Sequence, residues 1–189
     1  MRGRSALDIL LLILNSNKMN AHVKLVKDAI EGYFKTGKIP PPPKDLPKKF
    51  TASRAGVFVS IYNGKNLRGC IGTYLPTAPT LAEEIMQNSI SAATEDYRFN
   101  PITKEELPKL SYSVYVLDEP REIKNIDELD PKKYGILVRS ETGKSGLLLP
   151  DLKGINTRGE QIKAVCHKAG INLSKEKITI LKFGAIKYN

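Results

Sequence analysis

The chain has 189 residues, of which 41% are hydrophobic and 26% charged, so its composition excludes extensive disorder and fits one large domain or two small lobes. Its formal net charge is +10, but residues 1–56 hold eleven Lys and Arg against four Asp and Glu, whereas residues 57–189 hold nineteen against sixteen. No RNA-binding aromatic motif or recognition helix accompanies this charge. Attraction to phosphate is therefore allowed, but recognition of nucleic-acid bases is not indicated.

Residues 1–18 need separate treatment. Arg2 and Arg4 precede an apolar run, residues 6–14, that Asp8 interrupts, and no small-residue cleavage site follows before Met19. The run is also shorter than the roughly 20 residues that span a bilayer. We interpret residues 1–18 as an amino-terminal extension and expect no membrane association; a packed amphipathic turn and a cleaved export signal are the alternatives.

The elements of the first half follow from local signals. Apolar residues at helical spacing predict a helix over 21–36 that ends at Gly37. Asn63-Gly64 between two β-rich runs, residues 57–62 and 67–74, predicts a hairpin. Thr80 with Glu83 is typical of a capping box and opens a helix that runs to about residue 95.

The second half is predicted to begin with a strand over 111–117, where residues alternate as in a sheet with one face covered. A second hairpin is expected over 134–149, and Thr157 with Glu160 predicts a helix that ends at Gly170. Residues 177–188 read as one closing strand. With no P-loop or GxGxxG motif, we predict an α+β fold with a largely antiparallel sheet flanked by helices.

The most informative segment is Leu67-Arg68-Gly69-Cys70-Ile71-Gly72-Thr73. In a regular strand the side chains alternate, which would place Arg68, Cys70 and Gly72 on one face. Glycines weaken a strand interior, so Gly69 and Gly72 indicate a bulge or the close approach of a ligand or another chain segment. The thiol and the guanidinium are therefore expected to point the same way.

Residues 67–72 resemble the signature hexapeptide of the AMMECR-type domain family. Further motifs in the family's order extend the resemblance over residues 19–189: Gly56–Val59, Asp96–Phe99, Ser145–Pro150 and Cys166–Gly170. Tyr97 stands where many members have proline. The resemblance implies an α+β fold with a larger lobe that carries the signature and a smaller accessory lobe. It also implies partner proteins of the Memo type and the radical-SAM type.

Cys70 is the candidate catalytic residue, because a neighbouring cation favours the thiolate, although a free cysteine also commonly just packs in a core. Arg68 needs an anionic partner, which we expect to be Glu95 or Asp96; with such a partner it is a structural clamp, and without one it binds carboxylate or phosphate. The candidate binding residues that belong with Cys70 are Arg68, Gly69, Gly72, Thr73, Asp96 and Arg98.

The second cysteine, Cys166, is expected to pack in the core, because adjacent helix residues point about 100° apart and Cys166 and His167 cannot share a target. Two cysteines are too few for a disulfide scaffold, and neither lies in a CxxC pair or at zinc spacing from histidines. We therefore predict a reducing, cytoplasmic location and no metal site, and no motif indicates a cofactor.

Two functions fit these features. The first is an enzyme or enzyme subunit with a small anion-binding cleft around Arg68 and Cys70, working with Memo-type and radical-SAM partners. The second is a non-catalytic adaptor that binds a protein partner or RNA through the same strand.

Overall fold

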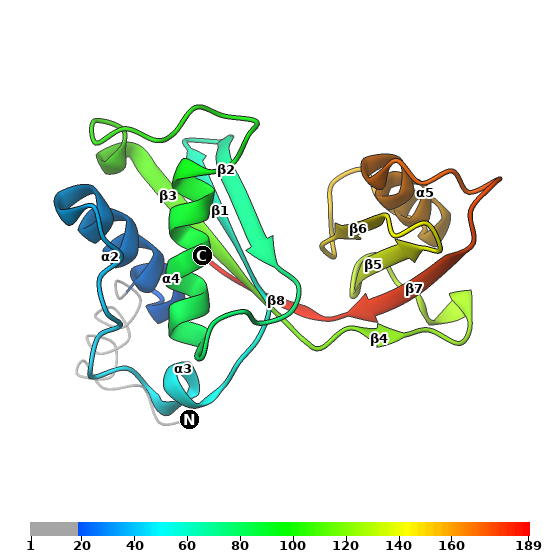
Figure 1. The fold of residues 1–189 in the computed structure, drawn as a ribbon, viewed down its shortest axis with the longest axis horizontal. Coiled ribbons are helices and arrows are strands. Elements are labelled where there is room, and N and C mark those ends of the chain that lie inside the picture. The colour runs from blue at the N-terminus through cyan, green and yellow to red at the C-terminus, as the bar shows by residue number, and fades with distance from the viewer. Residues whose placement is uncertain (1–18) are drawn as a thin grey trace, which may run out of the picture.

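The computed structural model describes residues 19–189, which form two lobes, each built on a four-stranded antiparallel sheet (Figure 1). Helices and antiparallel sheets together confirm the predicted α+β class. The predicted amino-terminal extension, residues 1–18, lies outside the described residues. Among the helices of residues 19–189, none combines the length and the apolar character needed to cross a membrane.

The larger lobe holds the sheet with strand order β2-β1-β3-β8. Its strands are β1 (Val57–Asn63), β2 (Asn66–Thr73), β3 (Leu110–Leu117) and β8 (Ala185–Tyr188). Its helices are α2 (Ala21–Thr36), the short α3 (Lys48–Ala52), α4 (Leu81–Thr94) and the 3-10 turn η1 (Leu107–Lys109). Helices α2 and α4 pack on the same face of this sheet, and the main hydrophobic core lies between them and the strands (Figure 1).

Local signals account for most boundaries in this lobe. The predicted hairpin of β1 and β2 is confirmed, as is α2, whose end at Gly37 has the left-handed conformation (φ 72°) that glycine permits. The hydroxyl of Thr80 accepts a hydrogen bond from the backbone N–H of Glu83, so α4 begins where it was predicted to. The Glu83 carboxylate accepts a hydrogen bond from the same hydroxyl.

The smaller lobe comprises residues 121–183 and has strand order β4-β7-β5-β6. Its elements are β4 (Arg121–Glu122), η2 (Ile126–Glu128), β5 (Gly135–Ser140), β6 (Ser145–Leu148), α5 (Arg158–Ala169) and β7 (Ile178–Phe183). Helix α5 begins with the predicted capping box of Thr157 and Glu160 and ends at Gly170. It closes a second core that includes Cys166, which is 2% exposed and packs as expected.

One expected element is wrong. Residues 177–188 do not form a single strand; β7 and β8 lie in different sheets, on either side of Gly184. The carbonyl of Gly184 accepts the backbone N–H of Asp118 at 2.9 Å, and a Cβ at Gly184 would overlap the Asp118 carboxylate. The break between β7 and β8 is thus set by Asp118, in the segment that leaves the larger lobe after β3. The smaller lobe is an insertion between β3 and β8, joined to the larger lobe by two chain crossings (Figure 1).

Candidate functional site

Strand β2 lies at the edge of the sheet, and side chains form hydrogen bonds with its backbone at Cys70. The Asp96 carboxylate accepts the Cys70 N–H at 2.8 Å, and Arg98 Nη2 donates to the Cys70 carbonyl at 3.2 Å. Both groups of Cys70 therefore point away from β1, toward the segment that follows α4. This pairing covers the exposed edge and fixes the backbone from which the thiol projects.

Asp96 and Arg98 are held to each other as well as to Cys70. Arg98 donates from Nε and Nη2 to the two carboxylate oxygens of Asp96 at 2.9 and 2.7 Å. These hydrogen bonds, with the one from Cys70, lower the pKa of Asp96 to about 2, although burial acts in the opposite direction. Asp96 is therefore charged at neutral pH and anchors the guanidinium of Arg98 beside Cys70.

The thiol of Cys70 lies on the same face of the sheet as the side chain of Ser60 on β1. Cys70 is partly exposed, and its Sγ accepts a hydrogen bond of 3.3 Å from the Ser60 hydroxyl, its partner across β1 and β2. Cys70 is thus not sealed in the core, and its sulfur has a polar donor within the sheet.

The expected partner of Arg68 is wrong. A bulge in the pairing of β1 and β2 leaves Arg68 opposite no residue of β1. Its partner is Glu106, neither Glu95 nor Asp96: Nε and Nη2 bond the two Glu106 oxygens at 2.7 and 3.0 Å.

Two further N–H groups of Arg68 bond the carbonyls of Asn100 and Pro101 at 2.8 and 3.2 Å. The ion pair lowers the pKa of Glu106, which also accepts the N–H of Thr103. Arg68 is therefore a clamp that ties the segment before β3 to β2, and four of its five N–H donors bond other groups of the protein.

The two glycines of the signature serve close packing between chain segments. A Cβ at Gly69 would overlap the carbonyl oxygen of Ala92 in the last turn of α4. A Cβ at Gly72 would overlap Val57 and the ring of Phe58. The predicted close approach is present, and in both places another part of this chain makes it.

Thr73 belongs to a different polar cluster. Its hydroxyl donates to Glu84, a carboxylate only 1% exposed that also accepts the N–H groups of Thr77 and Ala78 at 2.7 and 2.6 Å. Burial opposes ionisation of Glu84, but the hydrogen bonds outweigh it and lower its pKa. Glu84 thus fixes the loop between β2 and α4.

A cleft of about 330 Å³ lies between the two lobes, and Cys70 is on its wall. It is lined by Phe58, Cys70, Ile71, Asp96, Tyr97 and Arg98 of the larger lobe and by Leu147, Leu148, Leu149, Leu152 and Lys168 of the smaller lobe. The structure therefore brings together three predicted site residues, Cys70, Asp96 and Arg98. Arg68, Gly69, Gly72 and Thr73 do not line this cleft.

Sequence reasoning missed the wall contributed by the smaller lobe. Its residues fall in or beside two motifs, Ser145–Pro150 and Cys166–Gly170, which were noted for the resemblance alone. The sequence feature that could have indicated this wall is Lys168, because a lysine at the end of a helix can bond a nearby carbonyl. In the structure its Nζ donates to the carbonyl of Leu147 at 2.9 Å.

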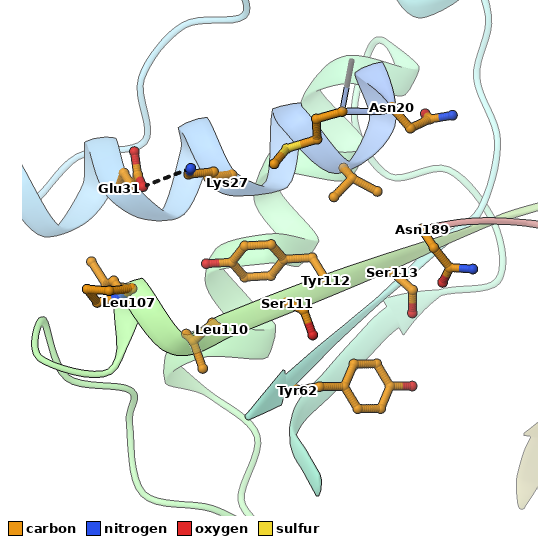
Figure 2. Close-up of a pocket in the computed structure, with 13 residues that line it drawn as sticks. Asn20, Lys27, Glu31, Tyr62, Leu107, Leu110, Ser111, Tyr112, Ser113 and Asn189 are labelled. Carbon is orange, nitrogen blue, oxygen red and sulfur yellow. Dashed lines mark ion pairs between the residues drawn. The ribbon is translucent and has the colours of Figure 1, made fainter. Parts of the chain in front are cut away.

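A larger cavity, of about 660 Å³, lies away from all of these residues, between α2 and the start of β3 (Figure 2). Tyr112 points toward α2, whereas Ser111 and Ser113 point to the other side of the strand (Figure 2). Its charged residues, Lys27 and Glu31, pair with each other at 3.9 Å. None of the predicted site residues lines it, and its lining within residues 19–189 includes no cysteine.

These features define a two-lobed α+β protein with a partly exposed cysteine and an anchored guanidinium in the cleft between its lobes. The sequence model of the AMMECR1 family matches residues 23–188, and the chain belongs to that family. The resemblance deduced from the signature is thereby confirmed.

Relatives match along nearly the whole chain. A Thermotoga maritima protein is 42% identical over 168 residues, which cover 88% of this chain and 96% of the relative. A Clostridium acetobutylicum protein is 44% identical over 86% of this chain but only 34% of its own length, so the matching part belongs there to a longer chain. The crystal structure of an uncharacterized protein from Pyrococcus horikoshii superposes with a TM-score of 0.80 at 33% identity and covers 88% of both chains.

Proposed function

We propose that the protein is an enzyme or enzyme subunit that binds a small anionic molecule in the cleft between its lobes, with Cys70 as the reacting group. The observation that carries the proposal is the partly exposed Cys70 on the cleft wall, next to the Arg98 guanidinium that bonds the Cys70 carbonyl. A nearby cation favours the thiolate, which is the nucleophilic form of cysteine. Arg98 takes the anion-binding role that the sequence suggested for Arg68.

The proposal includes partners of the Memo and radical-SAM types, by family resemblance. The Clostridium acetobutylicum relative supports a cooperative role, since its matching part is joined to further sequence in one chain. In such an arrangement the cleft would complete its reaction with groups from another protein.

Alkylation of Cys70 tests the reacting group directly. In a Cys166→Ala background, the proposal requires iodoacetamide to modify Cys70 faster than free cysteine at pH 7, because the thiolate is the form of cysteine that reacts. Mass spectrometry of the labelled peptide measures the rate. Arg98→Gln should remove most of the increase, and Arg121→Gln, which changes an exposed arginine outside the cleft, should leave it intact. A rate no greater than that of free cysteine below pH 8 rejects Cys70 as an activated nucleophile.

An adaptor function has one observation in its favour. Tyr97 is 96% exposed at the cleft, between the two anchored residues Asp96 and Arg98. Tyrosine is enriched among the residues that dominate binding energy at protein interfaces, and a solvated ring on a fixed backbone is suited to that role. This favours a partner protein over RNA as the docked molecule.

Binding to a purified Memo-type protein tests the adaptor function. Tyr97→Ala is expected to weaken that binding by at least about 30-fold, the effect of a residue worth about 2 kcal/mol at an interface. Ile186→Ala, at a side chain 58% exposed on β8, is the matched control and should leave binding unchanged. Equal affinity of the wild type and Tyr97→Ala, measured by calorimetry, excludes Tyr97 as the docking residue.

A further inference from the structure

We propose that the cleft between the lobes takes a small amphipathic monocarboxylate, a molecule with one carboxylate and an apolar aliphatic or aromatic body. The inference rests on the proposed function, because it concerns the same cleft, and it adds the chemical class of the ligand. Two independent properties of the cleft walls carry it: their charge and their apolar surface.

The charge of the cleft matches a single negative charge. Within the described residues 19–189, the charged side chains that line the cleft are Asp96, Arg98 and Lys168, which together amount to +1. Both oxygens of the Asp96 carboxylate accept hydrogen bonds from Arg98 or Cys70, so Asp96 does not neutralise the second cation, Lys168. A monoanion restores neutrality in the cleft, whereas a cation is repelled and a dianion leaves one charge unmatched.

Both cations retain free donors. Arg98 uses Nε and Nη2 within the protein, and its Nη1 makes no hydrogen bond to any of residues 19–189. Lys168 makes one hydrogen bond in the same part of the chain, to the carbonyl of Leu147. A carboxylate has oxygens for both cations, and since Asp96 holds the guanidinium in place, little side-chain entropy is lost when the anion binds.

The rest of the cleft is apolar and comes from both lobes. Six of its side chains are hydrocarbon: Phe58, Ile71, Leu147, Leu148, Leu149 and Leu152. Water in contact with these groups is released when an apolar body replaces it, which favours binding. The volume of about 330 Å³ lies at the lower end of the range of ligand pockets, so the body is small, and a nucleotide or polyanion does not fit these walls.

Isothermal titration calorimetry on the full chain with hexanoate and octanoate tests the class. Affinity is expected to rise about fourfold for each added methylene, the effect of burying that group in an apolar site. Octanol and octylamine, which keep the body and lose the negative charge, should bind at least about tenfold more weakly than octanoate. Equal binding of octanol and octanoate, or affinity independent of chain length, overturns the proposal.

Paired variants locate the ligand. Lys168→Met should weaken octanoate binding about tenfold, whereas Lys163→Met, on the same helix but outside the cleft, should leave it unchanged. Leu149→Asn should also weaken it about tenfold, and Leu173→Asn, at a leucine 44% exposed elsewhere in the smaller lobe, should have no effect. If neither Lys168→Met nor Leu149→Asn weakens octanoate binding, the ligand lies outside the cleft and the proposal is overturned.

Protection of Cys70 from iodoacetamide separates this inference from the proposed function. If inorganic phosphate protects Cys70 and octanoate does not, the ligand class is wrong while an anion-binding cleft stands. If octanoate binds with the expected chain-length dependence but Cys70 alkylates no faster than free cysteine, the ligand class stands and the proposed chemistry fails.

Discussion

Replacing Gly69 with alanine is expected to destabilise the protein by about 3 kcal/mol, which lowers Tm by about 6–12 °C for a chain of this size. The new Cβ would overlap the carbonyl oxygen of Ala92 and lie 3.2 Å from its carbon. Both atoms are backbone in the last turn of α4, so a side-chain rotation cannot relieve the overlap. Strand β2 must move away from the helix, and the neighbouring Cys70 moves with it.

Gly159→Ala is the matched control for this change. At Gly159, in the first turn of α5, an added Cβ would meet no atom within 4 Å, and alanine favours the helix. Thermal and urea unfolding of both variants measure the difference. A Gly69→Ala protein as stable as Gly159→Ala would mean that β2 and α4 are not packed backbone against backbone.

Replacing Asp96 with asparagine is expected to cost about 2 kcal/mol at pH 7, because Asp96 has a folded pKa of about 2 against an ordinary value of 3.8. An amide keeps the shape of the side chain, but its NH₂ group cannot accept the bonds that one carboxylate oxygen takes from Arg98 and Cys70. The variant therefore loses charge-assisted hydrogen bonds on a side chain 3% exposed.

The same carboxylate predicts how stability depends on pH. Since its pKa is lower in the folded state than in the unfolded state, its stabilisation is complete above about pH 5 and is lost as the pH falls through 4 toward 2. The stability difference between the wild type and Asp96→Asn should therefore shrink from about 2 kcal/mol at pH 7 to about 1 kcal/mol at pH 3.

Urea unfolding at the two pH values measures this difference. Glu95→Gln, at the neighbouring exposed carboxylate, is the control and should change stability by less than about 0.5 kcal/mol. A difference for Asp96→Asn that is equally large at pH 3 and pH 7 would assign the stabilisation to something other than the charge of Asp96.

Elements that depend on neighbouring residues were predictable from the sequence. Gly37 and Gly170 end helices because each adopts a left-handed conformation, and Thr80 and Thr157 begin helices through their hydroxyl groups. Asn63-Gly64 likewise specifies the hairpin of β1 and β2. In each case the residues that form the structure lie within a few positions of one another.

The errors arise where distant residues decide the outcome. Arg68 and Glu106 are 38 positions apart, and nearer acids, Glu95 and Asp96, were equally plausible partners before the path of the chain was known. The bulge that leaves Arg68 opposite no residue of β1 likewise depends on the pairing of two strands and not on β2 alone. The apolar wall of the cleft requires the placement of one lobe against the other, which no local pattern describes.

The insertion of the smaller lobe has a practical consequence. The chain leaves the larger lobe after Leu117 and returns at Ala185, and these two residues are partners on adjacent strands. Topologically, residues 118–184 occupy the place of a hairpin turn, and domains attached in this way are among those that tolerate excision or exchange. A short designed turn from Leu117 to Ala185 would thus yield a miniature protein in which Cys70 and its anchors stand open on one side, ready for comparison with the intact molecule.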